Sequence, residues 1–375
     1  MLINDSGIYL FVYFFVAICA VLDSIIKDRP VKLALLLVSG ATVVALIALR
    51  WNIGTDWDAY HQYFLANING VVYGSELVDH FDIGYRYLNT FVALITSHYT
   101  VFLLITTLLS TGIVCYLLWK HTDHPTIGFF VFLCSYVPIH FMGSIRRSIA
   151  ISFALLSIFI CLKAKGKFIS FFTMVASTAF HKTSLVAVPV LFLKPTPWRN
   201  IVVFIFLGGT AFLGFVNISE LTLLKIGEVA PKDSEIGLLI TIANYSGDNY
   251  KLHTPDSLDP IRQSVLSLVK KYVFFYFLYN AAKNKKMHSS INIVLYKIYV
   301  IGVCIYSVFI GAPIIQTIST YYLVIEVFLA AILFGHLSGV RKIMFIVFLA
   351  ASGFLAFESG LSVYPDLFFP YKSIF

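Results

Sequence analysis

The first side chains that could do chemistry follow one another in the segment RWNIGTDWDAYHQYF, which begins at Arg50. Asp56 and Asp58 are carboxylates of the kind that serve as general bases, and Tyr60 follows them. Arg50 is a guanidinium of the kind that binds phosphate oxygens through two parallel hydrogen bonds. Thr55 and Asp56 also suit the cap of a following helix, because short side-chain oxygens accept bonds from free backbone amides. The alternative is an ordinary interfacial helix with an aromatic belt.

The pair Asp56 and Asp58 also resembles the acidic pairs of metal-dependent glycosyltransferases. Oxygen-binding cations take about six ligands, and no other acid is tied to this pair by spacing. The pair is therefore a weak sign of a metal. The five cysteines fall inside apolar segments without C-x-x-C spacing, so we expect them to pack as small hydrophobic residues.

Two adjacent arginines, Arg146 and Arg147, begin an apolar run in the segment SIRRSIA. Neighbouring guanidiniums can bind the oxygens of a lipid diphosphate. The alternative is a positive pair at the cytoplasmic surface. The charge pattern of the chain favours the first reading, because the next basic cluster, at 163–167, must then lie in the cytoplasm, which leaves the arginines outside.

Two further groups interrupt apolar segments. In FHKTS, His181 could act as a general base and Lys182 could hold an anion, or the segment could be a turn at the membrane interface. Near the end of the chain, Glu326 is the deepest acid within a span and follows the aromatic residue Tyr321. A structural ion pair for Glu326 is at least as good an explanation as a catalytic role.

The elements that must position these groups are strongly apolar. Hydrophobic residues make up 59% of the 375 residues and charged residues only 12%, against about 25% in soluble domains. Too few charges remain to cover a water-exposed surface, which excludes a soluble enzyme, a disordered chain and a nucleic-acid-binding domain. We therefore expect a single integral membrane domain over residues 1–375, and the net charge of +8 reflects membrane orientation.

The apolar stretches predict an all-α polytopic membrane protein with about 11–13 transmembrane helices. The segment 8–26 is too long for the core of a signal peptide and should remain as a helix. The segment 84–97 is predicted to be re-entrant or to lie in the outer leaflet, because a full span there would spoil the alternation of charges. The candidate spans are 8–26, 31–49, 100–119, 126–144, 148–163, 168–181, 183–193, 200–217, 266–282, 291–310, 318–336 and 341–357.

Loop charges predict the orientation of these spans. Short basic clusters lie at 27–32, 163–167, 194–199, 283–286 and 341–342, and these should face the cytoplasm. The segments 50–83 and 218–263 are richer in acids and should form extracytoplasmic loops. This layout fits a multi-pass protein of the bacterial inner (cytoplasmic) membrane whose active face is extracytoplasmic. No nucleotide-binding glycine motif and no G-x-S-x-G motif is present, so nucleotide-driven pumping and serine hydrolysis lack support.

Five segments, in this order, resemble the EpsG-like branch of the Wzy polymerases, which polymerise bacterial O-antigen and exopolysaccharide. The resemblance covers about residues 50–193 and the C-terminus but not 218–263. It implies a glycosyltransferase of the GT-C type, with matching functional positions in the first, third and fourth of these segments. The segments are RWNIGTDWDAYHQYF, DIGYRYLN, SIRRSIAISFALLSIF, TAFHKTSLVAVPVLF and PYKSIF, and the matching positions are Arg50, Gly54, Asp56, Tyr60, Arg146, His181 and Ser184.

The reaction implied by the resemblance moves a glycan from undecaprenyl diphosphate to the non-reducing end of another lipid-linked repeat unit. The donor carries its own leaving group, so the resemblance implies no cofactor, no nucleotide sugar and no bound metal. The implied partners are the undecaprenyl-diphosphate-linked oligosaccharide, membrane lipid and a chain-length regulator protein, and no nucleic acid.

Two positions depart from the family pattern. The family usually has Gln where this chain has Arg147, and it often has Arg before the paired aromatics of a late span, where Gln316 lies near Tyr321 and Tyr322. Arg147 is a candidate to replace that late arginine.

The expected mechanism is a direct, inverting displacement, in which a base takes the acceptor proton and cations stabilise the departing diphosphate. Aromatic residues in 51–63 and 245–250 are expected to stack on sugars. The alternatives are an O-antigen ligase, a lipid-linked oligosaccharide flippase or transporter, and a structural membrane subunit. The expected roles are base for Asp56 or His181, diphosphate binding for Arg50, Arg146, Arg147 and Lys182, and substrate binding for Asp58, Tyr60, Tyr321 and Glu326.

Overall fold

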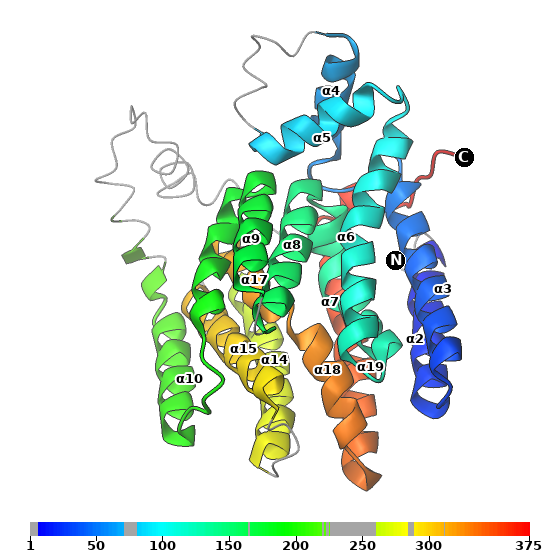
Figure 1. The fold of residues 1–375 in the computed structure, drawn as a ribbon. Coiled ribbons are helices and arrows are strands. Elements are labelled where there is room, and N and C mark those ends of the chain that lie inside the picture. Colours follow the sequence, from blue (N-terminus) through cyan, green and yellow to red (C-terminus); the bar gives the residue numbers. More distant parts are fainter. Residues whose placement is uncertain are drawn as a thin grey trace. The chain divides into compact units, whose positions relative to one another are not determined.

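The protein is helical throughout the residues that its computed structural model describes, which are 7–70, 81–163, 166–219, 221–222, 225, 260–283, 289–310 and 312–375 (Figure 1). Among these residues the one β-contact is an isolated bridge between Arg50 and Ser373. In the described part of the chain, seven helices are long and apolar enough to cross a membrane, and three more are apolar but shorter. The prediction of an all-α polytopic membrane protein is confirmed, and the number of 11–13 spans stays a prediction.

The chain divides into two compact units, Met1–Lys194 with Val324–Phe375, and Pro195–Leu323. Each unit is described by itself, and the single domain expected over 1–375 stays a prediction. Several residues used in the sequence analysis lie outside the described part of the chain, namely Glu76, Asp79, Lys165, residues 226–259, which include the aromatic positions 245–250, and residues 284–288.

The first unit contains most of the predicted spans, with ends that agree to within a few residues. Its elements are α2 (Gly7–Ile25), α3 (Arg29–Ala48), α4 (Trp57–Ile68), α5 (Ile83–Ala93), α6 (Tyr99–His121), α7 (Pro125–Tyr136), η2 (Val137–Met142), α8 (Ile145–Cys161), α9 (Lys167–Phe180), η3 (Lys182–Phe192), α18 (Glu326–His336), α19 (Gly339–Ser362) and α20 (Pro365–Phe368).

Helix α7 forms the centre of the first unit. Its sequence is apolar on all sides, as expected for a helix surrounded by protein, and 89% of the span Pro125–Met142 is buried. Helices α2, α3, α6, α18 and α19 pack around it. Within this span α7 continues as the π-helix η2 at Val137–Met142. Pro138 lacks a backbone N–H, so the regular hydrogen-bond ladder is interrupted there.

Two predicted segments that are too short for an ordinary span each form a helix of 11 residues. Helix α5, predicted as 84–97, has 11 residues, or about 17 Å at 1.5 Å per residue. That is well short of the ~30 Å hydrocarbon core, which agrees with the prediction that this segment is not a full span. The segment predicted at 183–193 is η3, a 3₁₀-helix of 11 residues that contains Pro189.

The second unit is built around α15 (Ser290–Val308), which packs against α10 (Asn200–Phe215), α14 (Pro260–Lys283) and α17 (Thr320–Leu323). Buried aromatic rings fill this core, and Tyr299 of α15 donates a hydrogen bond to the carbonyl of Lys271 at 2.9 Å. The predicted span 318–336 corresponds to the candidate span Thr317–His336, which contains η4 (Thr317–Ser319), α17 and α18 and follows α16 (Pro313–Gln316).

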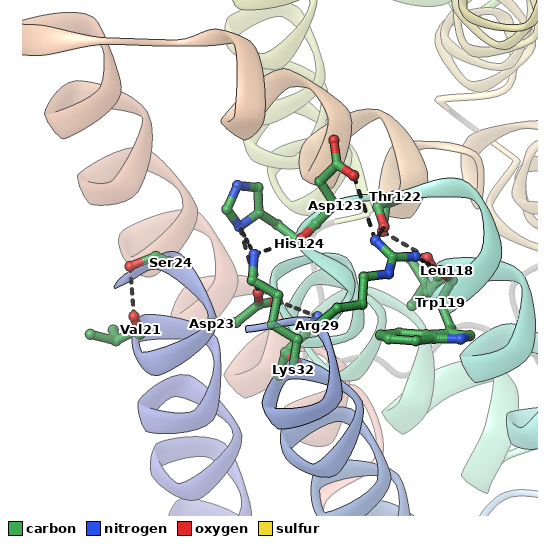
Figure 2. Close-up of polar contacts among 11 residues, drawn as sticks. Val21, Asp23, Ser24, Arg29, Lys32, Leu118, Trp119, Thr122, Asp123 and His124 are labelled. Carbon is green, nitrogen blue, oxygen red and sulfur yellow. Dashed lines mark hydrogen bonds and ion pairs between the residues drawn. The ribbon is translucent and has the colours of Figure 1, made fainter. Parts of the chain in front are cut away.

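A buried charge cluster joins α2, α3 and the start of α7 at one end of the first unit (Figure 2). Lys32 Nζ lies 3.1 Å from Asp23 Oδ1 and 3.1 Å from His124 Nδ1, and it donates to the carbonyl of Asp123 at 2.7 Å. Asp23 Oδ2 accepts from the backbone N–H of Thr126 at 2.8 Å. The sequence placed Lys32 in a basic cluster facing the cytoplasm, but its side chain is only 6% exposed. We infer that it anchors α2 and α3 to the α6–α7 turn.

We predict that Lys32→Met destabilises the protein by about 3 kcal/mol, because the buried Asp23 carboxylate loses its lysine partner and keeps only His124 and the backbone N–H of Thr126. Thermal unfolding in detergent measures this loss. The exposed Lys27→Met is the control and should change stability little. Adding Asp23→Asn to Lys32→Met should recover part of the loss, and equal stability of all the variants would contradict the inferred anchor.

Candidate functional site

Most predicted site residues of the first unit lie where α3 ends, α8 begins and α9 ends, whereas Glu326 begins α18. Helices α4 and α5 lie together over this end of the unit (Figure 1). Helix α5 packs on both α4 and α9, and the end of the chain, 367–374, pairs with the segment after α3. Segments far apart in the sequence therefore supply one polar cluster.

Arg50 holds the turn between α3 and α4. Its Nε donates to the carbonyl of Ile53 at 3.0 Å and its Nη1 to that of Ile47 at 2.8 Å, and the residue is only 1% exposed. The structure therefore places this predicted diphosphate ligand against backbone oxygens. Gly54, with a φ of 109°, makes the predicted turn. A Cβ there would overlap the carbonyl oxygen of Met142, so the turn touches the end of η2 directly.

The C-terminal motif PYKSIF secures the same turn. The backbone N–H of Ile374 donates to the carbonyl of Leu49 at 3.1 Å, and that of Trp51 donates to Lys372 at 2.9 Å. The hydroxyl of Tyr371 donates to the carbonyl of Leu46 at 2.9 Å. The bonds to Leu49 and Leu46 satisfy carbonyls at the end of α3, which gives this motif a structural role at the site.

A hydrogen-bonded network links α4 to the junction of η2 and α8. The buried hydroxyl of Tyr60 donates to Asp56 Oδ2 at 3.2 Å and lies 3.0 Å from Ser144 Oγ. Arg146 Nε donates to the Tyr60 oxygen at 3.3 Å, and Arg146 Nη1 forms an ion pair with Asp82 Oδ2 at 3.0 Å. Tyr60 thus connects a carboxylate to a guanidinium. Burial, and secondarily the charge of Asp56, raises the pKa of Tyr60, which keeps its hydroxyl protonated.

The predicted side-chain cap of α4 is not formed. Asp56 occupies the cap position, but its side chain makes no capping bond and accepts from Tyr60 instead. Thr55 Oγ1 donates to the carbonyl of Gly143 at 3.3 Å. Asp56 is thus bound by a residue of the second turn of α4, whereas Thr55 binds across the fold, because the turn lies directly on the end of η2.

Arg146 and Arg147 occupy different surroundings, since successive helix residues point about 100° apart. The Arg146 guanidinium lies 5.0 Å from the ring centre of Phe81 and 5.8 Å from that of Tyr60. It therefore faces α4 and α5, and its side chain is 21% exposed. Arg147 is half-buried, and its charge acts on His181.

His181 lies between α9 and η3, with its Nδ1 3.3 Å from Thr183 Oγ1. Burial, together with the charges of Arg147 and Arg146, lowers the pKa of His181 to about 3. The imidazole is therefore uncharged at neutral pH and only weakly basic. It would become a stronger base if an anion neutralised the two arginines, because their charges oppose its protonation.

Other predicted residues are placed as follows. Asp58 is exposed in the first turn of α4, and Lys182 is exposed at the start of η3. Glu326 is buried at the start of α18, 4% exposed. Tyr321 belongs to the second unit. The matching position Ser184 is buried in η3. Within the described residues, no cluster of three or more His, Cys, Asp or Glu side chains could hold a metal ion.

Sequence reasoning missed two contributors to this cluster, Asp82 and Ser144, and also Arg86, which lines a recess beside Asp82. Asp82 was counted only as an acid of an outer loop, although it pairs with Arg146 across 64 positions. Both Asp82 and Arg86 belong to the segment DIGYRYLN. This segment is one of the five ordered motifs, and that order was the only sequence signal that pointed to these two residues. Spacing alone could not reveal the pairing.

We predict that Gly54→Ala lowers stability by about 3 kcal/mol or more, because it adds backbone strain to a clash with Met142. Gly70→Ala is the matched control: Gly70 also has a positive φ, of 67°, but its added Cβ would meet no atom within 4 Å. That substitution should cost only about 1–2 kcal/mol. If both variants lower the unfolding temperature by similar amounts, the close contact between Gly54 and Met142 is contradicted.

We predict that His181 makes the fold acid-sensitive. Its pKa is lower in the folded state, about 3, than in the unfolded chain, about 6.5. The unfolded state therefore binds the proton first, and stability that is present above pH 6.5 is lost as the pH falls toward 3. His181→Gln should show a smaller drop in unfolding temperature between pH 7 and pH 5 than the wild type. The exposed His98→Gln should match the wild type, and an unchanged drop in His181→Gln would oppose this assignment.

Comparison with known proteins gives one match. A search of the curated proteins found no significant match, and neither did a search of the solved structures. The model of the EpsG family matches residues 33–373, which is nearly the whole chain and includes four of the five motifs in full and the first four residues of PYKSIF. The family resemblance drawn from the motifs is confirmed, and the chain belongs to the EpsG family.

Proposed function

We propose that this multi-pass membrane protein polymerises a bacterial surface polysaccharide by transferring an undecaprenyl-diphosphate-linked glycan onto the non-reducing end of another lipid-linked repeat unit. Membership of the EpsG family supports a polysaccharide-polymerase function in general terms. The observation that carries the specific proposal is the network of Asp56, Tyr60 and Arg146, which holds a carboxylate and a guanidinium together.

Arg146 and Arg147 are proposed to bind the departing diphosphate. Negative charge develops on that group as the anomeric C–O bond breaks, and fixed guanidiniums stabilise it most where water is partly excluded. Arg146 is held in place by Asp82, Tyr60 and the ring of Phe81 before substrate arrives. Arg50, whose guanidinium binds carbonyls of its own turn, supports this site as a positioning residue.

Asp56 is proposed as the general base. The acceptor hydroxyl gives its proton to the Asp56 carboxylate, its oxygen forms the new bond to the anomeric carbon, and the diphosphate leaves from the opposite face with the electron pair of the broken bond. The bond from Tyr60 orients the carboxylate. Asp58, which is exposed in the first turn of α4, is proposed to contact sugar hydroxyls. His181 is the alternative base, and Tyr321 and Glu326 stay proposed substrate contacts.

The site is proposed to face away from the cytoplasm. At the end of the first unit that holds the polar cluster, the chain leaves α3 at Arg50 and enters α8 at Arg146. At the other ends of these helices and of their neighbours lie many basic residues, as the positive-inside rule requires of cytoplasmic loops. They are Lys27, Arg29, Lys120, Lys163, Lys167, Arg341 and Lys342. This orientation suits an inner-membrane enzyme that uses lipid-linked glycans on the outer side.

We predict that Arg146→Ala lowers polymerisation by about 100-fold or more, because a positioned donor to a developing anion contributes on that scale. Asp56→Asn should have a similar effect. The measurement is complementation of a gene deletion, with the surface glycan of the cell run on a gel. The control is Lys167→Gln, which removes an exposed charge from the other end of α9 and should keep a full ladder.

The gel also separates the candidate functions. A lipopolysaccharide core that bears a single repeat and no ladder in the deletion strain supports the polymerase. Bare core would point to a ligase or a flippase, and an unchanged ladder in Arg146→Ala would overturn the diphosphate assignment. Membrane fractions blotted for each variant show whether the protein is present in equal amounts.

A further inference from the structure

A recess opens between the start of α5 and the end of α9, next to the network of Arg146. Its volume is about 240 Å³, below the range of about 300–1,000 Å³ that is typical of sites enclosing whole small molecules. It therefore suits a head group better than an entire lipid-linked glycan. Its lining includes Phe81, Asp82 and Arg86 from the α5 side and Lys182 from η3.

Cationic side chains outnumber acidic ones among the described residues that line the recess. Arg86 and Lys182 contribute two cations, and the one lining carboxylate, Asp82, is already compensated by its ion pair with Arg146. A guanidinium and an ammonium are the two side-chain groups that bind phosphate oxygens most readily. The chemistry of the recess therefore fits a phosphate or diphosphate group.

The walls of the recess are held rigidly. A Cβ on Gly84 would lie 2.8 Å from the carbonyl oxygen of Ala179, so the backbones of α5 and α9 are in direct contact. This contact lies close to both cations in the sequence, with Arg86 two residues after Gly84 and Lys182 three residues after Ala179. Arg86 and Lys182 are thus presented to the recess from elements that cannot shift freely.

The recess shares a wall with the proposed catalytic network. Phe81 and Asp82 line the recess on one side, and on the other they contact the Arg146 guanidinium. The outer surface of α5 is apolar, with Ile83 51% exposed and Tyr87 72% exposed. A prenyl chain attached to a diphosphate in the recess could therefore remain in the bilayer.

We propose that this recess holds the diphosphate of the acceptor lipid, while the donor diphosphate leaves beside Arg146 and Arg147. This inference rests on the proposed polymerase function, in which two lipid diphosphates must be bound at the same time and only one departs. Asp82 and Phe81, which form the shared wall, would lie between the two diphosphates and separate their charges. Arg86 and Lys182 are the binding residues of the second site.

The test counts diphosphates bound to the full chain in phosphatidylcholine nanodiscs, with farnesyl diphosphate as the probe and native mass spectrometry as the readout. The wild type should bind two molecules. Arg86→Gln with Lys182→Gln should bind one, with the second weakened about tenfold or more, since each charged hydrogen bond contributes about 1.5–3 kcal/mol. Arg86→Lys with Lys182→Arg, which keeps both charges, should still bind two and shows that the fold tolerates changes here.

The matched control is Lys167→Gln with Arg341→Gln, which removes two exposed charges at the other ends of α9 and α19. It should bind two molecules, as the wild type does. A wild type that binds a single molecule, or two molecules regardless of Arg86 and Lys182, would overturn the second site. Neither result would affect the ladder test of Arg146, so the two proposals fail separately.

Two further probes identify the source of the anion. Inorganic pyrophosphate should occupy the recess more weakly than farnesyl diphosphate, because it lacks the chain that stays in the bilayer. Nanodiscs containing phosphatidylglycerol should not block the second molecule. If phosphatidylglycerol displaces it as effectively as farnesyl diphosphate does, the recess binds membrane phospholipid and the assignment to the acceptor is wrong.

Discussion

The ion pair between Arg146 and Asp82 is the interaction on which the proposed site depends. A guanidinium at the end of an apolar helix keeps its charge at low cost only where oxygen atoms surround it. Asp82 and Tyr60 supply them, at 3.0 and 3.3 Å. The same pair fixes the start of α5 against α8, which places the recess beside the network. Binding geometry and helix packing are therefore set by one contact.

The polar clusters at the two ends of the first unit differ in their exposure, and this difference indicates their roles. Around Asp23 and Lys32 the charges are buried, and they bind one another and backbone atoms, which suits a structural anchor. At the other end, Asp56, Arg146 and Lys182 keep part of their surface accessible. The accessible cluster is the one able to meet a substrate.

Close backbone contacts give the site its precision. Gly54 lies against Met142, and Gly84 against Ala179, where any larger residue would push two elements apart. The C-terminal segment adds backbone bonds to the end of α3. Loops at a membrane surface are usually mobile, so these contacts are the physical reason that groups from α4, α5, α8 and η3 can act together.

The sequence by itself determined the membrane class, most helix limits and the family, because hydrophobicity summed over about 20 residues and the order of motifs can be read along the chain. It also named most residues of the polar cluster. Only the tertiary structure decided their partners. Asp82 binds Arg146 across 64 positions, Lys32 is buried against Asp23, and Arg50 donates to backbone carbonyls of its own turn. Partners depend on how helices pack, and one sequence does not reveal which helix faces meet.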